Sequence, residues 1–370
     1  MQSKHRIFAE DLLLAAEGED HFDRIPDSLV LIIFNKLADA RSLGRCSAVS
    51  RRFNALVPLV DDACLRIDRV IPADAACDGL APGGPRPRAV LSHLLKAMLQ
   101  AVLKPFAHCD AKSGGAHGGK HAHAQQLQHH SPAQVLKNFS SIRNLRMELP
   151  VSDVGTDDGV VLKWKAVFGT TLQSCVILGG TKVERAAAGS MPPSPAAAES
   201  EATGDDSGGI PESFYTNGGL KLRVVWTISS LIAAATRHYL LREIVKEHPT
   251  LEHVALTDAQ GQGTLAMAAD QLREFRDKPL AAAAAANRTQ VPACNMKLRY
   301  APVLELSDGT RIHGATLVVI KPVGEAGGGG VGAGRKELDE FVADTFDGPF
   351  REAVAVLSKR RTYLLEMNGF

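Results

Sequence analysis

The stretch FDRIPDSLVLIIFNKLADARSLGRCSAVSRRFNALVPLV, residues 22–60, decides the first domain of this chain. Three short helical patterns follow one another within it. The first begins at Pro26, where the cap oxygens of the next two residues suit free helix amides, and it runs to about Ala38. The second begins near Ala40 and the third behind Ser50. The pattern therefore predicts three helices joined by tight turns.

The first of these helices is apolar around nearly its whole circumference, from Leu29 to Phe34. An amphipathic surface helix would keep one polar face. Two short neighbouring helices cover only one side, so a hydrophobic face is left for another surface. That surface belongs either to the rest of the chain or to a partner protein. A flexible linker after the three helices favours the partner, because a tethered module presents its own face outward.

Position by position, this segment resembles the F-box motif. Two positions differ mildly, because Ile25 stands where the family usually has Leu and Phe53 where it often has Trp. The whole chain also resembles a group of plant F-box proteins through NFSSIRNLRMELP, DDGVVLKWKAVFGTTLQSCVILGG and REIVKEHPTLEHVALTD. The matching motif positions are Ile25-Pro26-Asp27, Leu29, Ile32, Ile33, Leu37, Leu43, Cys46, Val49-Ser50-Arg51, Phe53 and Leu56-Val57.

The resemblance implies a substrate-recognition subunit of an SCF-type ubiquitin ligase. The helical module would bind a Skp-type adaptor, which joins it to a cullin and a RING subunit, and the rest of the chain would bind a protein target for ubiquitination and degradation. The alternative is an adaptor-bound scaffold or regulator that acts without cullin-dependent degradation. Carried over by position, the adaptor interface would be formed or supported by Ile25, Pro26, Leu29, Ile32, Ile33 and Leu37, with Val49 and Phe53 partly in the internal core.

Charge argues against a polyanion binder. The chain has 42 Lys plus Arg against 41 Asp plus Glu, so no whole-chain field attracts nucleic acid or an anionic membrane. A helix-turn-helix reading fails for a second reason, because the third helix, SRRFNALV, offers few base-reading side chains. The arginines Arg45, Arg51 and Arg52 are then a solvated helix face. No apolar run is long enough to span a bilayer, and we expect the protein in the nucleus, the cytoplasm or both.

Changes in composition mark the predicted domain boundaries of the chain. Residues 1–21 are expected to be disordered, and the F-box spans 22–61. Residues 62–133 are rich in Ala, Gly, Pro and His, which predicts a flexible linker with one helix at about 89–106. The remaining domain, 134–370, carries three simple stretches that we interpret as disordered insertions, at 186–209, 279–292 and 323–334.

The pattern of 134–370 predicts an irregular, curved, leucine-rich-repeat-like α/β domain that presents a binding surface. The whole chain is then expected to be an α+β multi-domain protein. Three segments, beginning at Ile142, Leu172 and Leu251, share the apolar-x-x-apolar-x-apolar strand template. A further strand is expected at Leu220–Trp226 and a hairpin around Asp308-Gly309. The other expected elements are helices at Val160–Phe168, Ile228–Glu247, Lys336–Phe346 and Phe350–Arg360 and a last strand at Tyr363–Met367.

Ligand motifs are weak. Gly261-x-Gly263-x-x-Ala266 imitates a dinucleotide fingerprint, but its glycines lie several residues past the strand. The run Gly327–Gly334 lacks the Lys-Ser/Thr pair of a phosphate loop, and the histidines between 108 and 130 stand among glycines that fix no metal geometry. No nucleophile elbow or zinc-protease motif occurs. We therefore predict no catalytic residues, no cofactor and no metal.

Overall fold

The computed structural model describes residues 21–67, 132–150, 159–185, 209–277, 289–324, 342 and 344–370. Several sequence predictions fall elsewhere. The N-terminal segment up to residue 20, the helix at about 89–106 and most of the three insertions lie outside the described residues. The same holds for most of the helix expected at Lys336–Phe346.

The three predicted N-terminal helices are confirmed as α2 (Asp27–Leu37), α3 (Ala40–Ser47) and α4 (Arg51–Leu56), between the 3-10 turns η1 (His21–Arg24) and η2 (Val57–Leu59). Helix α2 ends at Ala38, which adopts the left-handed conformation with φ of 52°. The Asp39 carboxylate then caps α3 by accepting from the backbone N–H of Ser42 at 2.8 Å. Ser50 Oγ caps α4 in the same way, through the backbone N–H of Phe53.

The rest of the chain folds around one ten-stranded mixed sheet, so the mixed α+β class is confirmed. Strand order is β1-β2-β6-β7-β3-β4-β9-β8-β10, and β5 pairs with β9. The β1–β2, β2–β6 and β3–β7 pairs are parallel, while the others are antiparallel. The strands are β1 (Asp62–Arg66), β2 (Asn144–Leu149), β3 (Val161–Phe168), β4 (Leu172–Gly180), β5 (Lys182–Glu184), β6 (His253–Asp258), β7 (Gly263–Met267), β8 (Cys294–Glu305), β9 (Arg311–Pro322) and β10 (Tyr363–Met367).

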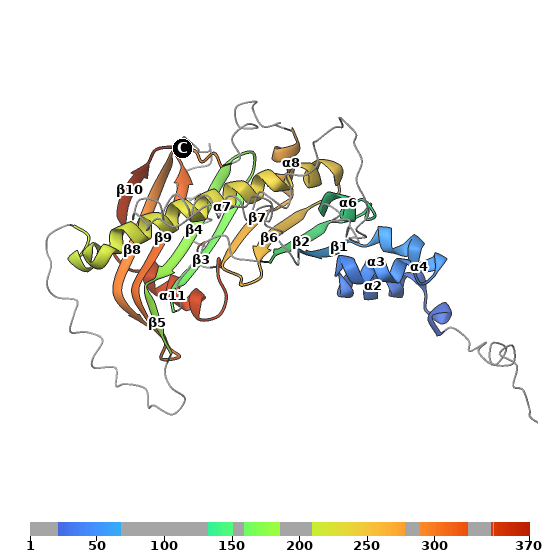
Figure 1. Cartoon of the computed structure of the whole chain (residues 1–370), viewed down its shortest axis with the longest axis horizontal. Coiled ribbons are helices and arrows are strands. Elements are labelled where there is room, and N and C mark those ends of the chain that lie inside the picture. Colours follow the sequence, from blue (N-terminus) through green and yellow to red (C-terminus); the bar gives the residue numbers. More distant parts are fainter. Residues whose placement is uncertain are drawn as a thin grey trace, which may run out of the picture.

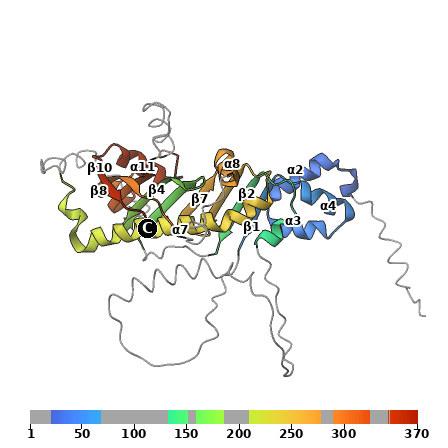
Figure 2. The same cartoon turned by 90° about the horizontal axis from the view of Figure 1, so that it is seen from above.

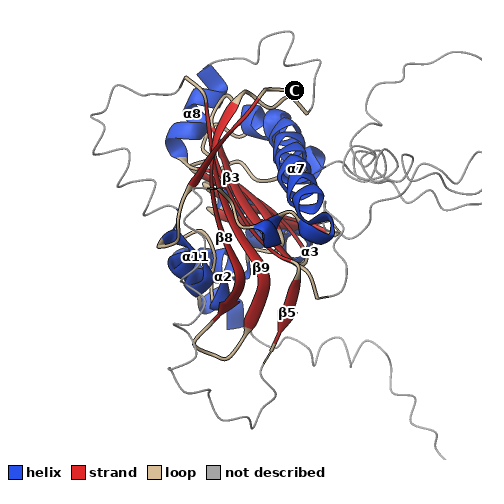
Figure 3. Ribbon diagram, turned by 90° about the vertical axis from the view of Figure 1, so that its left-hand side faces the viewer, coloured by secondary structure: helices blue, strands red, loops and turns tan. Residues whose placement is uncertain are grey.

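Helices cover the two faces of the sheet unequally. The long helix α7 (Gly219–Glu247) crosses one face, with α6 (Pro132–Leu136) and the turns η5 (Glu212–Phe214) and η6 (Thr216–Gly218) at its ends. The opposite face carries α11 (Pro349–Ser358) over β8 and β9 (Figure 3). Helix α8 (Ala269–Asp277) follows β7 and contacts both β7 and α7. Two apolar cores result, one under α7 and one under α11.

Two element predictions and the repeat architecture are wrong. Val160–Phe168 is strand β3 rather than a helix, and Leu220–Trp226 is the first part of α7 rather than a strand. The leucine-rich-repeat arrangement needs its template strands side by side and parallel. Of the three, β2 and β6 are parallel neighbours, but β4 lies between β3 and β9 and pairs antiparallel with both. The hairpin β8–β9, helix α11 and strand β10 are confirmed.

The expected flexible linker does not begin at residue 62. Residues 62–66 form strand β1, which pairs in parallel with β2 and makes one edge of the sheet. The residues on one side of β1, Ala63 and Leu65, are buried in the core that also contains Phe34 and Leu43 of the helical module. Seen from above, the three helices stand directly at this end of the sheet (Figure 2). Strand pairing and shared burial therefore attach the module to the sheet.

Candidate functional site

Helix α2 divides into a buried side and an exposed apolar side. Val30 and Phe34 are 1% and 4% exposed and belong to the core. Four other apolar side chains of α2 face solvent at spacings of three, four and eight residues, which places them on one stripe of the helix. We call this the α2 stripe: Leu29 (49% exposed), Ile32 (55%), Ile33 (47%) and Leu37 (43%). Exposed aliphatic side chains gathered this way mark a surface made for a protein contact.

The other predicted interface residues divide between surface and core. Pro26 is exposed and Ile25 is half-buried against the core. Phe53 lies half-buried between two rings, edge-on to Phe34 at 5.3 Å and to Phe22 at 5.6 Å between centroids. Its expected place in the internal core is therefore supported. Val49 was expected there too, but it lies beyond the end of α3 and is 73% exposed, so that expectation is wrong.

Arg52 fixes the start of α2 instead of facing solvent as a mere surface charge. Its Nε donates to Asp27 Oδ1 at 2.8 Å, and its Nη1 donates to the carbonyl oxygen of Phe22 at 2.6 Å. Its Nη2 donates to the carbonyl oxygen of Ile25. The Asp27 carboxylate therefore binds Arg52 of α4. The predicted side-chain cap at the N-terminus of α2 is absent, because no side chain there accepts a hydrogen bond from the first helix amides. One arginine thus ties η1, the Ile25-Pro26 turn and α4 together behind the α2 stripe.

A set of hydrogen bonds joins the helical module to the sheet, and we refer to it as the junction. Asn35 Oδ1 accepts from the backbone N–H groups of Asp61 at 2.8 Å and Asp62 at 3.2 Å. The carbonyl oxygen of Ala38 accepts from the backbone N–H of Cys64 at 2.7 Å, so the α2–α3 turn adds a parallel bridge to the outer edge of β1. These bonds fix the orientation of α2 relative to the strands.

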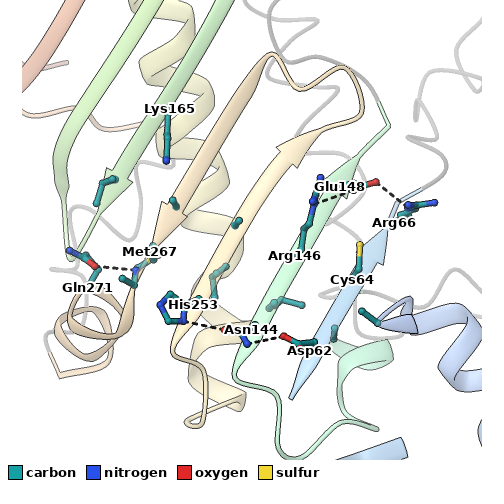
Figure 4. A pocket seen from close by; sticks show the side chains of 18 of the residues that line it. Asp62, Cys64, Arg66, Asn144, Arg146, Glu148, Lys165, His253, Met267 and Gln271 are labelled. Carbon is teal, nitrogen blue, oxygen red and sulfur yellow. Dashed lines mark hydrogen bonds and ion pairs between the residues drawn. The ribbon is translucent and has the colours of Figure 1, made fainter. Parts of the chain in front are cut away.

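Next to the junction, the described residues leave part of the sheet face opposite α7 uncovered, and that part forms a groove. Its volume is about 760 Å³, and Figure 4 shows it from close by. Asn35 of α2 and Ala38, just after that helix, line one end, and Gln271 at the start of α8 lines the other. The outward side chains of β1, β2, β6, β7 and β3 form the floor between them. The groove is therefore built jointly by the helical module and the sheet.

Charged and polar side chains lie across the groove in two rows. In one row, Glu148 contacts both Arg66 Nε at 3.1 Å and Arg146 Nε at 3.2 Å. In the other, Asp62 Oδ1 accepts from Asn144 Nδ2 at 2.8 Å, and Asn144 Oδ1 lies 3.1 Å from His253 Nδ1, so that the imidazole donates there. The groove is thus polar along both rows.

Cys64 lies on the floor of the groove, between those two rows. Burial and the nearby Glu148 carboxylate raise the pKa of its thiol above the ordinary value. A thiol that stays protonated at neutral pH is a poor nucleophile. Cys64 is therefore a small floor residue rather than a reactive group.

The dinucleotide-like glycines have structural roles instead. Gly263 packs against Trp164, and a Cβ at Gly263 would lie 2.1 Å from the indole Cε2. Gly261 has φ of +60° in the turn between β6 and β7. The Asp258 carboxylate closes that turn by accepting from the backbone N–H groups of Gln262 and Gly263, each at 2.8 Å. The negative charge of a carboxylate in this position would repel a pyrophosphate.

The remaining candidate ligand groups give no site. His248 is buried, which lowers the pKa of its imidazole, and the run Gly327–Gly334 and the histidines between 108 and 130 lie outside the described residues. Among the residues that the structure describes, no three His, Cys, Asp or Glu side chains are close enough to share a metal ion. No helix in the same part of the chain is both long and apolar enough to cross a membrane.

Sequence reasoning missed the groove because its floor spans distant segments. Arg66 was assigned to the linker, and Arg146 and His253 belong to strands that the repeat pattern placed in other positions. The available signal was the alternation of polar and apolar residues in Asp62–Arg66 and Asn144–Leu149, which marks one buried and one open side of a strand. Which strands would adjoin was not readable from that alternation.

Comparisons with known proteins agree with the helical module and extend over the whole chain. The F-box-like family matches residues 22–65. The chain is 48% identical to F-box protein At4g18380 and 46% identical to F-box protein At5g46170, both from Arabidopsis thaliana, over 95% of this chain and 94% of each relative. It is 37% identical to F-box protein AUF1 of the same plant, over 95% of this chain and all of the relative. No solved structure matches it.

Proposed function

This chain belongs to the F-box protein family, and from that membership we propose that it is a substrate-recognition subunit of an SCF-type ubiquitin ligase. The helical module of residues 22–60 binds a Skp-type adaptor, through which a cullin and a RING subunit join the complex. The sheet domain binds the protein target. The complex acts in the nucleus, the cytoplasm or both.

The α2 stripe is the observation that carries this proposal. Leu29, Ile32, Ile33 and Leu37 expose between 43% and 55% of their surface, although the same helix buries Val30 and Phe34 almost completely. Burying such aliphatic groups against a partner contributes about 25 cal/mol for each Å² removed from water. The binding free energy concentrates in a few such anchors near the centre of an interface. A Skp-type adaptor that covers the stripe supplies that burial.

The role of this chain in ubiquitin transfer is to position the target rather than to catalyse. Holding two reactants in a fixed geometry replaces a bimolecular encounter and can raise the effective concentration by many orders of magnitude. The junction supports this role, because Asn35 and Ala38 bond directly to the backbone of residues 61–64. A target held by the sheet is then kept at a fixed distance from the adaptor.

The test is co-purification of the full chain with a Skp-type adaptor and a cullin, using Ile33→Asp as the variant. Val224→Asp is the matched control, because Val224 is also a helical aliphatic residue and its exposure, 46%, is nearly that of Ile33, 47%. Circular dichroism and urea unfolding establish that both variants fold. We expect Ile33→Asp to lose the adaptor and the cullin together, while Val224→Asp keeps both.

Two other outcomes decide against the proposal in different ways. If Ile33→Asp retains the adaptor as well as the native chain does, the α2 stripe is not the interface. If the native chain recovers the adaptor but never the cullin, the protein is an adaptor-bound scaffold that acts without cullin-dependent degradation.

A further inference from the structure

We propose that the groove beside the junction binds an extended acidic segment of the target protein, with Arg66 and Arg146 as its principal contacts. This inference rests on the proposed function and names the surface of the sheet domain that recognises the target. It follows from the position of the groove, the exposure of the two arginines and the shape of the floor.

The guanidinium groups of Arg66 and Arg146 are largely exposed to solvent. Glu148 lies 3.1 Å from the Nε atom of Arg66 and 3.2 Å from the Nε atom of Arg146, and the two arginine side chains are 66% and 64% exposed. Within the described part of the chain, neither arginine pairs with a residue other than Glu148, so the exposed part of each guanidinium can meet a ligand. Guanidinium groups bind carboxylates through paired, charge-assisted hydrogen bonds. Two carboxylates of a ligand can therefore be held side by side above Glu148.

The carboxylates of the groove are already occupied. Glu148 lies between the two guanidinium groups, with 22% of its side chain exposed, and Asp62 accepts from Asn144. Among the described residues that line the groove, these two acids are outnumbered by three basic side chains, which are Arg66, Arg146 and, across the floor from Arg66, Lys165. The excess of positive charge favours an acidic occupant and disfavours a basic one.

The register of the strands gives the groove its length. Arg66 is opposite Glu148, Glu148 opposite Thr257, Thr257 opposite Thr264, and Thr264 opposite Lys165. Four steps between neighbouring strands at about 4.8 Å each separate the two basic ends by roughly 19 Å, the span of about six extended residues. Thr257 and Thr264 are half-buried and lie on the same side of the sheet as Glu148, between the two basic ends.

The row of side chains beside the one from Arg66 to Lys165 leaves room for a peptide backbone. It runs from Cys64 through Arg146, Ala255 and Ala266 to Val167. Apart from Arg146, these side chains are short, so a backbone can lie close to the sheet while its acidic side chains reach the arginines. A free inorganic anion would occupy little of the 760 Å³ volume, and the chain's net charge of +1 does not suit nucleic acid. A protein segment fits the groove best.

The location of the groove matters for the ligase. Asn35 of α2 and Ala38, which directly follows that helix, line one of its ends, and α2 is the helix that carries the α2 stripe. A segment bound in the groove therefore lies beside the adaptor-binding module, on the face away from α7. This places the target on the sheet to which the adaptor-binding helices are hydrogen-bonded.

Binding of labelled peptides to the full chain, purified with its Skp-type adaptor, tests the proposal by fluorescence anisotropy. The probe is an uncapped mixed Glu/Asp/Gly/Ser peptide of about twelve residues, and its neutral counterpart replaces every acid with Gln or Asn. The variant is Arg66→Gln with Arg146→Gln. The matched control is Arg311→Gln with Arg351→Gln, two arginines of similar side-chain exposure, 48% and 56%, each in one surface ion pair outside the groove.

We expect the acidic probe to bind and its neutral counterpart to bind at least tenfold more weakly. The groove variant should lose about tenfold or more in affinity for the acidic probe, because two charge-assisted contacts disappear, while the control stays within about twofold. Rising salt should weaken binding to the native chain, since the groove is open to solvent.

Three results would overturn the proposal. The first is that the acidic probe does not bind the native complex, and the second is that the groove variant binds it as well as the control does. The third is that a phosphoserine version of the probe binds while the carboxylate version does not. The last result would assign the groove to a phosphorylated target. Adaptor recovery, measured on the same preparations, keeps the two proposals apart: a chain that holds its adaptor but ignores the probe refutes the groove alone.

Discussion

The side-chain oxygen Oδ1 of Asn35 lies 2.8 Å from the backbone nitrogen of Asp61 and accepts its hydrogen bond. Asn35 belongs to α2 and Asp61 directly precedes β1, so this bond connects the helical module to the first strand of the sheet. The same oxygen also accepts from the backbone N–H of Asp62 at 3.2 Å. One side chain thus satisfies two consecutive amides at the point where the chain changes from helix to strand.

Replacing Asn35 with alanine should destabilise the protein by about 1–3 kcal/mol. The change removes the acceptor for two amides in a part-buried place, and an amide left without a partner costs its full desolvation free energy. The control is Asn54→Ala, at an exposed position of α4, which should change stability by less than about 0.5 kcal/mol. Urea unfolding measures both. Equal stabilities for the two variants would mean that the junction is not held by Asn35.

Replacing Gly263 with alanine tests whether this glycine packs or binds a ligand. The new methyl group would meet the buried indole of Trp164 at 2.1–2.5 Å, so either the indole or the strand must move. We expect a loss of about 1–3 kcal/mol in thermal or urea unfolding. Gly44→Ala in α3 is the control, because nothing lies within 4 Å of its new methyl group, and helix propensity should make that variant slightly more stable.

The sequence predicted the helical module well because its signals are local. Pro26 and Ser50 mark helix starts, and the apolar spacing of each short helix lies within one or two turns. The stripe residues Leu29, Ile32 and Ile33 are exposed as the resemblance implied. The exposure of Val49 was not readable, because it depends on how α3 and α4 pack against each other.

The sheet domain was predicted less well because strand neighbours are set by long-range contacts. VVLKWKAVF was expected as a helix, but Leu162, Trp164, Ala166 and Phe168 are buried while their neighbours are only partly buried, which is the alternation of a strand. LKLRVVW alternates too, yet it has no turn residue before the next helical pattern, so α7 continues through it. The repeat template identified real strands, but spacing along the chain does not determine their order in the sheet.

A double-mutant cycle should reveal strong coupling between Arg237 and Asp258, whose side chains are both 0% exposed. Arg237 Nη2 lies 3.1 Å from Asp258 Oδ2, and Nη1 donates to the carbonyl oxygens of Leu256 and Gly263, which fastens α7 to the β6–β7 hairpin. Arg237→Met alone should cost about 3–5 kcal/mol, because it leaves a buried carboxylate without its cation.

The second half of the cycle uses Asp258→Asn, which keeps the shape of the side chain and removes its charge. We expect the double variant to be about 1–3 kcal/mol more stable than the sum of the single losses predicts, as measured by urea unfolding. Arg273 and Asp270 form an exposed ion pair on α8, and the same cycle there should give a coupling below about 0.5 kcal/mol. Additive losses at the buried pair would show that the ion pair does not couple α7 to the hairpin.

Acidification should destabilise the protein through His238. Its ring is buried between Phe168 and Phe275, and burial lowers the pKa of the imidazole to about 4 despite a hydrogen bond to the carbonyl oxygen of Gly169. The unfolded chain takes up the proton near pH 6.5, whereas the native state takes it up only near pH 4. The contribution of the neutral His238 to the free energy of unfolding is therefore fully present above pH 6.5 and is lost as the pH falls from 6.5 toward 4. The expected slope approaches about 1.4 kcal/mol per pH unit.

His238→Gln should flatten that slope in urea unfolding between pH 7.5 and pH 5. The glutamine amide can still donate to the carbonyl of Gly169, so the comparison isolates the titration from the hydrogen bond. Because burial also lowers the pKa of His248, a residual slope of the same sign should remain in His238→Gln. A variant whose stability depends on pH as steeply as that of the native chain would show that His238 does not supply the acid sensitivity.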